Sequence, residues 1–164
     1  MAGPGRRRDR PRRRPDVPHT SDETQGKGTP VPAITGHFTF TDWKENPVTE
    51  EGTVPRLAHA TVTNTFSGGI EAESTTCDYA IAYLTGTTGA FTGAELVGGR
   101  VDGRPGTFVL EERGRFEADG SVHCSFEVVE GSGTGELTGL RGSGGFTYRH
   151  GQTEVPYTFT YELE

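Results

Sequence analysis

Two glutamates, Glu95 and Glu112, are the residues of this 164-residue chain best suited to chemistry in an apolar interior. Glu95 stands in phase with Phe91 and Val97 at every second position, and Glu112 stands in phase with Leu110. Because successive strand residues point to opposite faces, both carboxyls are predicted to face inward together with the apolar residues. Burial disfavours the charged form and raises a carboxyl pKa, which suits a general acid or base near neutral pH.

The same two glutamates also have a structural interpretation. Each could pair with a neighbouring arginine at the rim of the domain, and Arg100, Arg113 and Arg141 are the available partners. An ion pair of this kind contributes little to stability and requires no ligand. The sequence leaves both interpretations open.

Aromatic residues recur along the chain and offer a second set of candidates. A tyrosine combines an apolar ring with a hydroxyl that can orient a ligand. Tyr83, Tyr157 and Tyr161 are the predicted ligand-binding residues, together with the two glutamates. The alternative is that these rings form ordinary core, since the last run alternates aromatic residues as a core strand does.

The remaining reactive side chains do not form recognisable sites. The five histidines lack the close spacing of metal ligands, so we expect no metal and no cofactor. Cys77 and Cys124 are the only cysteines and are predicted to be reduced structural thiols. His123 and Cys124 are adjacent in a strand and therefore point to opposite faces, which excludes a joint nucleophile and base.

A glycine-rich segment, residues 131–146, resembles a phosphate loop in composition but not in spacing. Seven of its first fifteen residues are glycine. No lysine follows the glycines, and Glu136 stands where a dinucleotide-binding motif needs its third glycine. The segment is therefore predicted to be a flexible bend that leads into a curved strand.

Charge divides the chain into two parts. Residues 1–32 carry eight basic and four acidic side chains, a net charge of +4, which leaves −11 (8 − 19) on residues 33–164. The acidic part would repel a phosphate backbone, so we expect no nucleic-acid binding by the folded domain. Residues 1–32 are rich in arginine and proline and are predicted to be a disordered tail.

Nothing in the sequence predicts export or membrane insertion. The paired arginines are not followed by the apolar segment of an export signal, and no run of about eighteen apolar residues could form a spanning helix. We therefore expect a cytoplasmic protein with no membrane partner.

Residues 33–164 alternate with a period of two and predict a single all-β domain. The strong turn signals are Asp102-Gly103, Asp119-Gly120 and Ser67-Gly68-Gly69. About eight strands are predicted, over residues 34–41, 56–66, 70–84, 90–99, 107–116, 121–129, 145–148 and 154–163. Short turns and the absence of covering helices favour a closed antiparallel barrel, with a sandwich as the alternative. Glycines inside the predicted strands, such as Gly93 and Gly139, are expected to let the sheet bend.

Several segments together resemble a bacterial family of small uncharacterised proteins, a domain of unknown function. The resemblance is carried by Glu71–Thr75, Phe91–Arg104, Gly106–Leu110 and Gly131–Phe146, and it extends from about residue 34 to residue 163. The family is similar to the allene-oxide-cyclase barrel, an eight-stranded antiparallel barrel with an internal cavity. The resemblance therefore implies that architecture.

The resemblance does not imply the chemistry of the cyclase, because none of the cyclase's active-site motif matches a position in this chain. After Phe108-Val109-Leu110 the family tends to have Gln-His, where this chain has Glu111-Glu112. A role of that histidine therefore does not carry over.

Three functions are compatible with these observations. The leading prediction is a barrel that binds a small, largely apolar molecule in its interior. The second is a cyclase or isomerase that holds a reactive hydrophobic substrate in the same cavity and uses one acid group. The third is a non-catalytic structural or protein-interaction barrel with a filled core. The sequence does not determine the oligomeric state.

Overall fold

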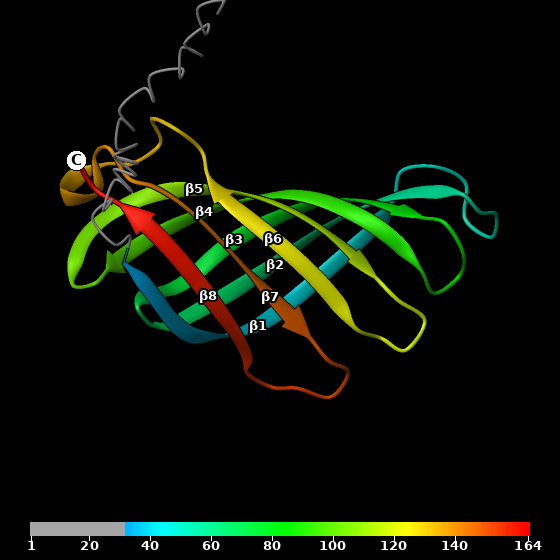
Figure 1. Ribbon diagram of the computed structural model, residues 1–164. Helices are drawn as coiled ribbons and strands as arrows, with labels where there is room; N and C mark the ends of the chain where they lie inside the picture. Colours follow the sequence, from blue (N-terminus) through cyan, green and yellow to red (C-terminus); the bar gives the residue numbers. More distant parts are fainter. Residues whose placement is uncertain (1–31) are drawn as a thin grey trace, which may run out of the picture.

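The computed structural model describes residues 32–164, which form one antiparallel barrel of eight strands (Figure 1). The elements follow the order β1 (Ala33–Pro47), β2 (Arg56–Gly68), β3 (Ile70–Tyr83), β4 (Gly89–Val101), β5 (Arg104–Phe116), β6 (Val122–Val128), the 3-10 helix η1 (Gly135–Leu137), β7 (Arg141–Tyr148) and β8 (Val155–Glu162). Each strand pairs with the next one in sequence, and β8 pairs with β1 to close the sheet. The predicted closed barrel is confirmed, and the sandwich is not found.

The prediction of a disordered tail concerns residues 1–32, and all but the last of these lie outside the described residues. Within residues 32–164, no helix has the length and apolar character that crossing a membrane requires.

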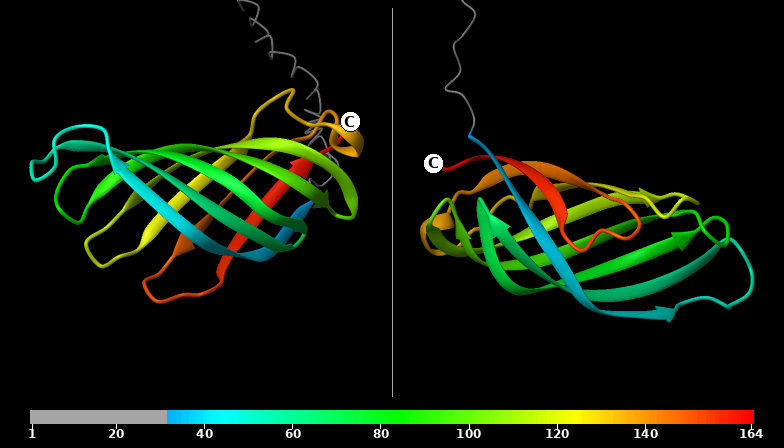
Figure 2. Two further views of the ribbon diagram at one scale, coloured as in Figure 1. Left: turned by 180° about the vertical axis from the view of Figure 1, so that it is seen from behind. Right: turned by 90° about the horizontal axis from the view of Figure 1, so that it is seen from below.

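The two ends of the barrel differ in how they are covered (Figure 2). One end, here called the closed end, carries the turns β2–β3 and β4–β5 and the long β6–β7 connection with η1. The other, the open end, carries the connections β1–β2, β3–β4, β5–β6 and β7–β8. The predicted turn at Asp102-Gly103 is confirmed, with φ angles of 47° and 80°, which is the left-handed backbone that a tight hairpin requires.

The glycine-rich segment closes one end of the barrel, which is more than the predicted bend. Its first half forms η1 and the flanking loops, and its second half forms β7. Leu137 and Leu140 are fully buried against the core. A Cβ on Gly106 would lie 2.1 Å from the carbonyl oxygen of Thr134, so this close approach of η1 to β5 requires glycine.

Glycines inside the strands make room for aromatic rings on the neighbouring strand. A Cβ on Gly93 would lie 2.6 Å from the ring of Tyr79, and a Cβ on Gly114 would lie 2.3 Å from the ring of Phe91. These two rings therefore pack over the glycines of the neighbouring strands. Gly139, which we expected inside a strand, lies instead in the β6–β7 connection with a φ of 84°.

Leu137 gives a direct test of the role of the β6–β7 connection. We expect Leu137→Ala to lower the free energy of unfolding by about 2–5 kcal/mol, because it leaves a cavity in a closely packed end. Urea denaturation measures the change. Leu96→Ala is the control, since Leu96 is 60% exposed on β4 and its loss should cost within about 0.5 kcal/mol. Equal losses for the two variants would show that the segment does not hold the barrel closed.

Candidate functional site

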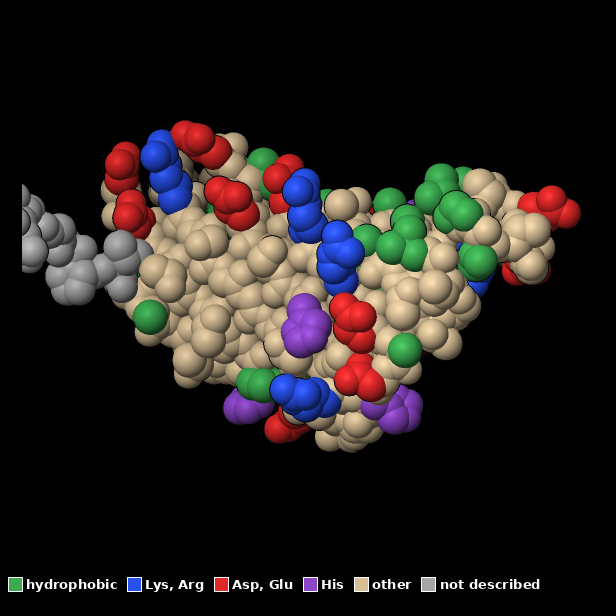
Figure 3. Space-filling view, turned by 45° about the vertical axis from the view of Figure 1, so that its right-hand side comes forward, with side chains coloured by type: hydrophobic (Ala, Val, Ile, Leu, Met, Phe, Trp, Pro, Cys, Tyr) green, Lys and Arg blue, Asp and Glu red, His purple; other side chains and the backbone are tan. Residues whose placement is uncertain are grey.

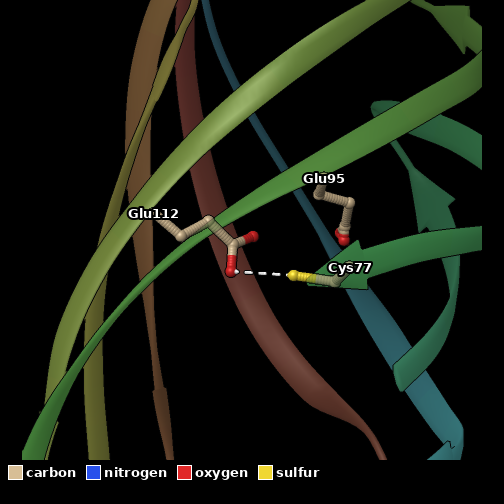
Figure 4. A group of neighbouring side chains, drawn as sticks. All are labelled: Cys77, Glu95 and Glu112. Atoms are coloured by element: carbon tan, nitrogen blue, oxygen red, sulfur yellow. Dashed lines mark hydrogen bonds between the residues drawn. The ribbon is translucent and has the colours of Figure 1, made fainter. Parts of the chain in front are cut away.

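Glu95 and Glu112 lie inside the barrel, as the alternation of the strands predicted. Glu95 is 0% exposed and Glu112 is 5% exposed. They are diagonal neighbours on β4 and β5, because Glu95 is in register with Leu110 and Glu112 with Gly93. The carboxyls and the thiol of Cys77 on β3 converge at one level of the interior (Figure 4). We call these three residues, with Asn64 and Tyr79, the buried polar cluster.

The carboxyl of Glu95 is held by Asn64 on β2. The side-chain nitrogen of Asn64 donates to both carboxyl oxygens, at 3.1 Å to Oε1 and 2.8 Å to Oε2. Burial, and next the charge of Glu112, raise the pKa of Glu95 to about 8, although the hydrogen bonds from Asn64 and Thr75 oppose the shift. Glu95 is therefore mostly protonated at neutral pH.

The carboxyl of Glu112 accepts two hydrogen bonds from β3. The hydroxyl of Tyr79 donates to Oε2 at 2.6 Å, and the thiol of Cys77 donates to the same oxygen at 3.5 Å. Burial raises the pKa of Glu112, while these two hydrogen bonds oppose the shift. Burial and the charge of Glu112 also raise the pKa of Tyr79, so its hydroxyl remains a donor.

The buried polar cluster contains three side chains that could each offer one atom to a cation. The ligand atoms of Cys77, Glu95 and Glu112 all lie within 4.8 Å of one another. Binding of a soft metal requires the thiolate. Burial and the nearby carboxyls raise the pKa of the Cys77 thiol, and its proton already bonds Glu112. In the contacts of the described chain the thiol is a hydrogen-bond donor to Glu112.

The alternative of arginine pairing is wrong for both glutamates. Within residues 32–164 the carboxylate ion pairs are His59 with Asp78 and Arg141 with Glu130. Arg100 donates to the carbonyl oxygen of Gly103 at 3.1 Å. No arginine of the described chain compensates the buried carboxyls.

A cavity of about 380 Å³ lies in the open half of the barrel, next to the buried polar cluster. Asn64 and Tyr79 line it, and both bond the carboxyls behind them. Neither Glu95 nor Glu112 lines it directly. The remaining wall is mainly apolar and includes Phe38, Phe40, Val62, Ile81, Phe91, Phe116, Val122, Phe146 and Val155.

Trp43 stands at the mouth of this cavity and was not identified from the sequence. The register of β1 against β2 shifts between Thr41 and Lys44, and Asp42 has a φ of 58°. Such a bulge redirects a side chain that would otherwise follow the alternation. The Trp43 ring lies over Tyr79, with 6.0 Å between the ring centroids, and Trp43 remains 51% exposed.

The three predicted tyrosines do not lie together. Tyr83 lines the cavity, and its hydroxyl donates to the carboxylate of Glu45 at 2.8 Å and 2.9 Å. Tyr157 belongs to the core of the closed half, where it accepts a hydrogen bond from the amide of Ile70 at 2.8 Å. Tyr161 also belongs to that core and donates to the carboxylate of Asp102. Neither Tyr157 nor Tyr161 lines the cavity.

Comparison with known proteins identifies relatives with the same fold. Residues 34–161 match the family described as "Protein of unknown function (DUF3224)". A crystal structure of a DUF3224 family protein of unknown function from Shewanella oneidensis MR-1 is similar, with 28% identity and a TM-score of 0.68. The match covers 82% of this chain and 98% of that chain. No curated protein matches this chain significantly.

The raised pKa of Glu95 predicts how stability depends on pH. The folded chain holds this proton up to about pH 8, whereas the ordinary value is 4.5. The contribution of protonated Glu95 to the free energy of unfolding is therefore largest below about pH 4.5. Between these values the folded state binds more protons than the unfolded state, so the free energy of unfolding falls as pH rises. For one group the fall is at most about 1.4 kcal/mol per pH unit. Urea denaturation at several pH values measures the slope.

Glu95→Gln should flatten this dependence, while the contribution of Glu112 remains. Glu111→Gln is the matched control, because Glu111 is the exposed neighbour of Glu112 on the outer face of β5. It should leave the slope as it is in the original chain. A Glu95→Gln slope equal to that of the original chain would contradict a protonated Glu95 in the folded state.

Proposed function

The chain belongs to the DUF3224 family of bacterial proteins of unknown function, and we propose that it binds one small, largely apolar molecule in the open half of its barrel. The observation that carries this proposal is the cavity of about 380 Å³ beside the buried polar cluster. Small-molecule pockets have volumes of about 300–1,000 Å³, with mainly apolar walls and a few polar groups. The volume of this cavity, its mainly apolar wall and its few polar groups agree with that description.

The division of the barrel interior supports the proposal. In the closed half, Phe108, Phe159 and Leu137 fill the space and are 0% exposed. In the open half the aromatic rings stand around the cavity instead of filling it. The packing of the closed half fits the alternative of a filled core, whereas the cavity of the open half supports a bound molecule.

Exposed apolar side chains near the open end support a route of entry. Figure 3 shows hydrophobic side chains gathered at the end of the molecule away from the grey segment. Phe40 and Trp43 at the mouth are 40% and 51% exposed, and Leu57 and Leu84 nearby are 49% and 52% exposed. An apolar ligand would meet this rim before it enters the cavity.

A cyclase or isomerase in the same cavity, as in the allene-oxide-cyclase barrel that the sequence resembles, is the second candidate. The observation in its favour is the pKa of Glu95 near 8, which gives an acid group at neutral pH. However, Asn64 and Tyr79 stand between the cavity and the two carboxyls. Binding therefore has more support than proton transfer to a substrate.

The proposal includes a cytoplasmic location and no nucleic-acid partner. Cys77 and Cys124 are both free and buried, which suits a reducing compartment. The net charge of −11 on residues 33–164 opposes contact with a phosphate backbone.

Binding can be tested with 1-aminoanthracene, an apolar probe whose emission rises and shifts to shorter wavelength in an apolar site. We expect saturable binding of one probe per chain. Quenching of Trp43 should accompany it, because Trp43 is the only tryptophan and stands at the cavity mouth. Titration with either emission signal measures the dissociation constant.

Val62→Phe should weaken this binding by about tenfold or more, equivalent to about 1.4 kcal/mol, because Val62 lines the cavity and the larger ring reduces its volume. Leu96→Phe adds the same ring on the exposed outer face of β4 and should leave binding unchanged. Circular dichroism checks that both variants fold. Failure of the probe to bind, or equal binding by the two folded variants, would count against the cavity as a ligand site.

A further inference from the structure

Asn64 and Tyr79 form the polar floor of the cavity, and each gives a hydrogen bond to a carboxyl behind it. The side-chain nitrogen of Asn64 donates to Glu95, and the hydroxyl hydrogen of Tyr79 is held by Glu112 at 2.6 Å. The two carboxyls therefore fix the direction of these hydrogen bonds from behind.

The floor offers two acceptor atoms to a ligand. Every fully buried side-chain nitrogen or oxygen among residues 32–164 has a hydrogen-bond partner. The side-chain oxygen of Asn64 makes no hydrogen bond within this part of the chain, so it is an accessible atom of a residue that lines the cavity. The oxygen of Tyr79 also keeps a free lone pair, since a phenol both donates and accepts.

The acidic groups around the floor disfavour an anionic ligand. Glu95 and Glu112 lie directly behind Asn64 and Tyr79, and among residues 32–164 no lysine or arginine lines the cavity. A carboxylate ligand would lose its water without gaining a cation, which is unfavourable in an apolar site. A neutral head group avoids this cost.

We propose that the cavity selects neutral apolar molecules that carry one hydrogen-bond donor, such as an alcohol or a phenol, because Glu95 and Glu112 turn the acceptor atoms of Asn64 and Tyr79 toward the ligand. This inference rests on the proposed function and adds the class of ligand. Glu95 and Glu112 are positioning residues in this arrangement, since they act on the ligand through Asn64 and Tyr79.

A matched pair of probes tests the selection. The probes are 2-naphthol, which carries a hydroxyl donor, and 2-methoxynaphthalene, which has the same rings without the donor. Isothermal titration calorimetry near pH 7 gives both dissociation constants. We expect 2-naphthol to bind about fivefold more tightly, the ratio that one net hydrogen bond gives.

Glu95→Leu should reduce this ratio toward one. Leucine offers no acceptor to the side-chain nitrogen of Asn64, so the amide is no longer held with its oxygen toward the cavity. Ile81→Val is the matched control, because Ile81 lines the cavity but touches none of the hydrogen bonds of the floor. It should change both dissociation constants by the same factor and preserve the ratio.

The outcomes separate the two proposals. If neither naphthalene probe nor 1-aminoanthracene binds, the proposed binding function fails. If both naphthalene probes bind the original chain equally, the cavity binds apolar molecules and the inferred selection is wrong. A fivefold ratio that persists in folded Glu95→Leu would overturn the role given to Glu95, whereas loss of the ratio only in this variant supports it.

Discussion

Pairing of β1 with β8 creates the interior on which the rest of this structure depends. Residues Ala33–Phe38 pair with Val155–Thr160 and remove the last free edges of the sheet. A closed sheet leaves no exposed ladder of backbone donors and acceptors, and it confines the inward side chains of eight strands to one space. Each of these side chains must then pack, find a polar partner or border a cavity.

The inward side chains are accommodated in different ways along the length of the barrel. Leu137 and Leu140 of the β6–β7 connection seal the closed half, where aromatic rings fill the space. At the middle level the buried polar cluster provides partners for its own carboxyls. Beyond it the rings of Phe91 and Tyr79 lie against glycines on neighbouring strands, at Gly114 and Gly93. Both rings also line the cavity, which occupies the space that remains.

Much of this arrangement can be predicted from the alternation of residues along each strand. What alternation cannot predict has a physical cause. The period of two placed Glu95 and Glu112 on the inner face, because that property depends only on each residue's own strand. The height of a residue along the barrel depends on register and strand tilt, which no single strand encodes. The sequence therefore grouped Tyr157 with Tyr83, although the structure places them in different halves.

The missed residues have equally specific causes. Trp43 enters the cavity mouth because a bulge at Asp42 interrupts the alternation of β1, and the sequence around it contains neither glycine nor proline to mark the bulge. Asn64 was not predicted as a site residue, because its role depends on the hydrogen bonds to a carboxyl that is 31 residues away in the sequence. That partner, Glu95, lies on β4, which does not pair with β2, so the contact crosses β3 on the inner face of the sheet.

The buried polar cluster lowers the stability of the fold, and its position next to the cavity suggests why it is present. Two carboxyls removed from water without a cation destabilise a fold relative to apolar side chains of similar size. A barrel that needed only stability would continue the apolar packing of the closed half through this level. Instead the cluster satisfies every buried polar atom and lies between the filled half and the cavity. Violations of ordinary core packing concentrate at functional sites. The polar layer of Asn64, Cys77, Tyr79, Glu95 and Glu112 is therefore the feature of the described interior that the needs of packing alone do not explain.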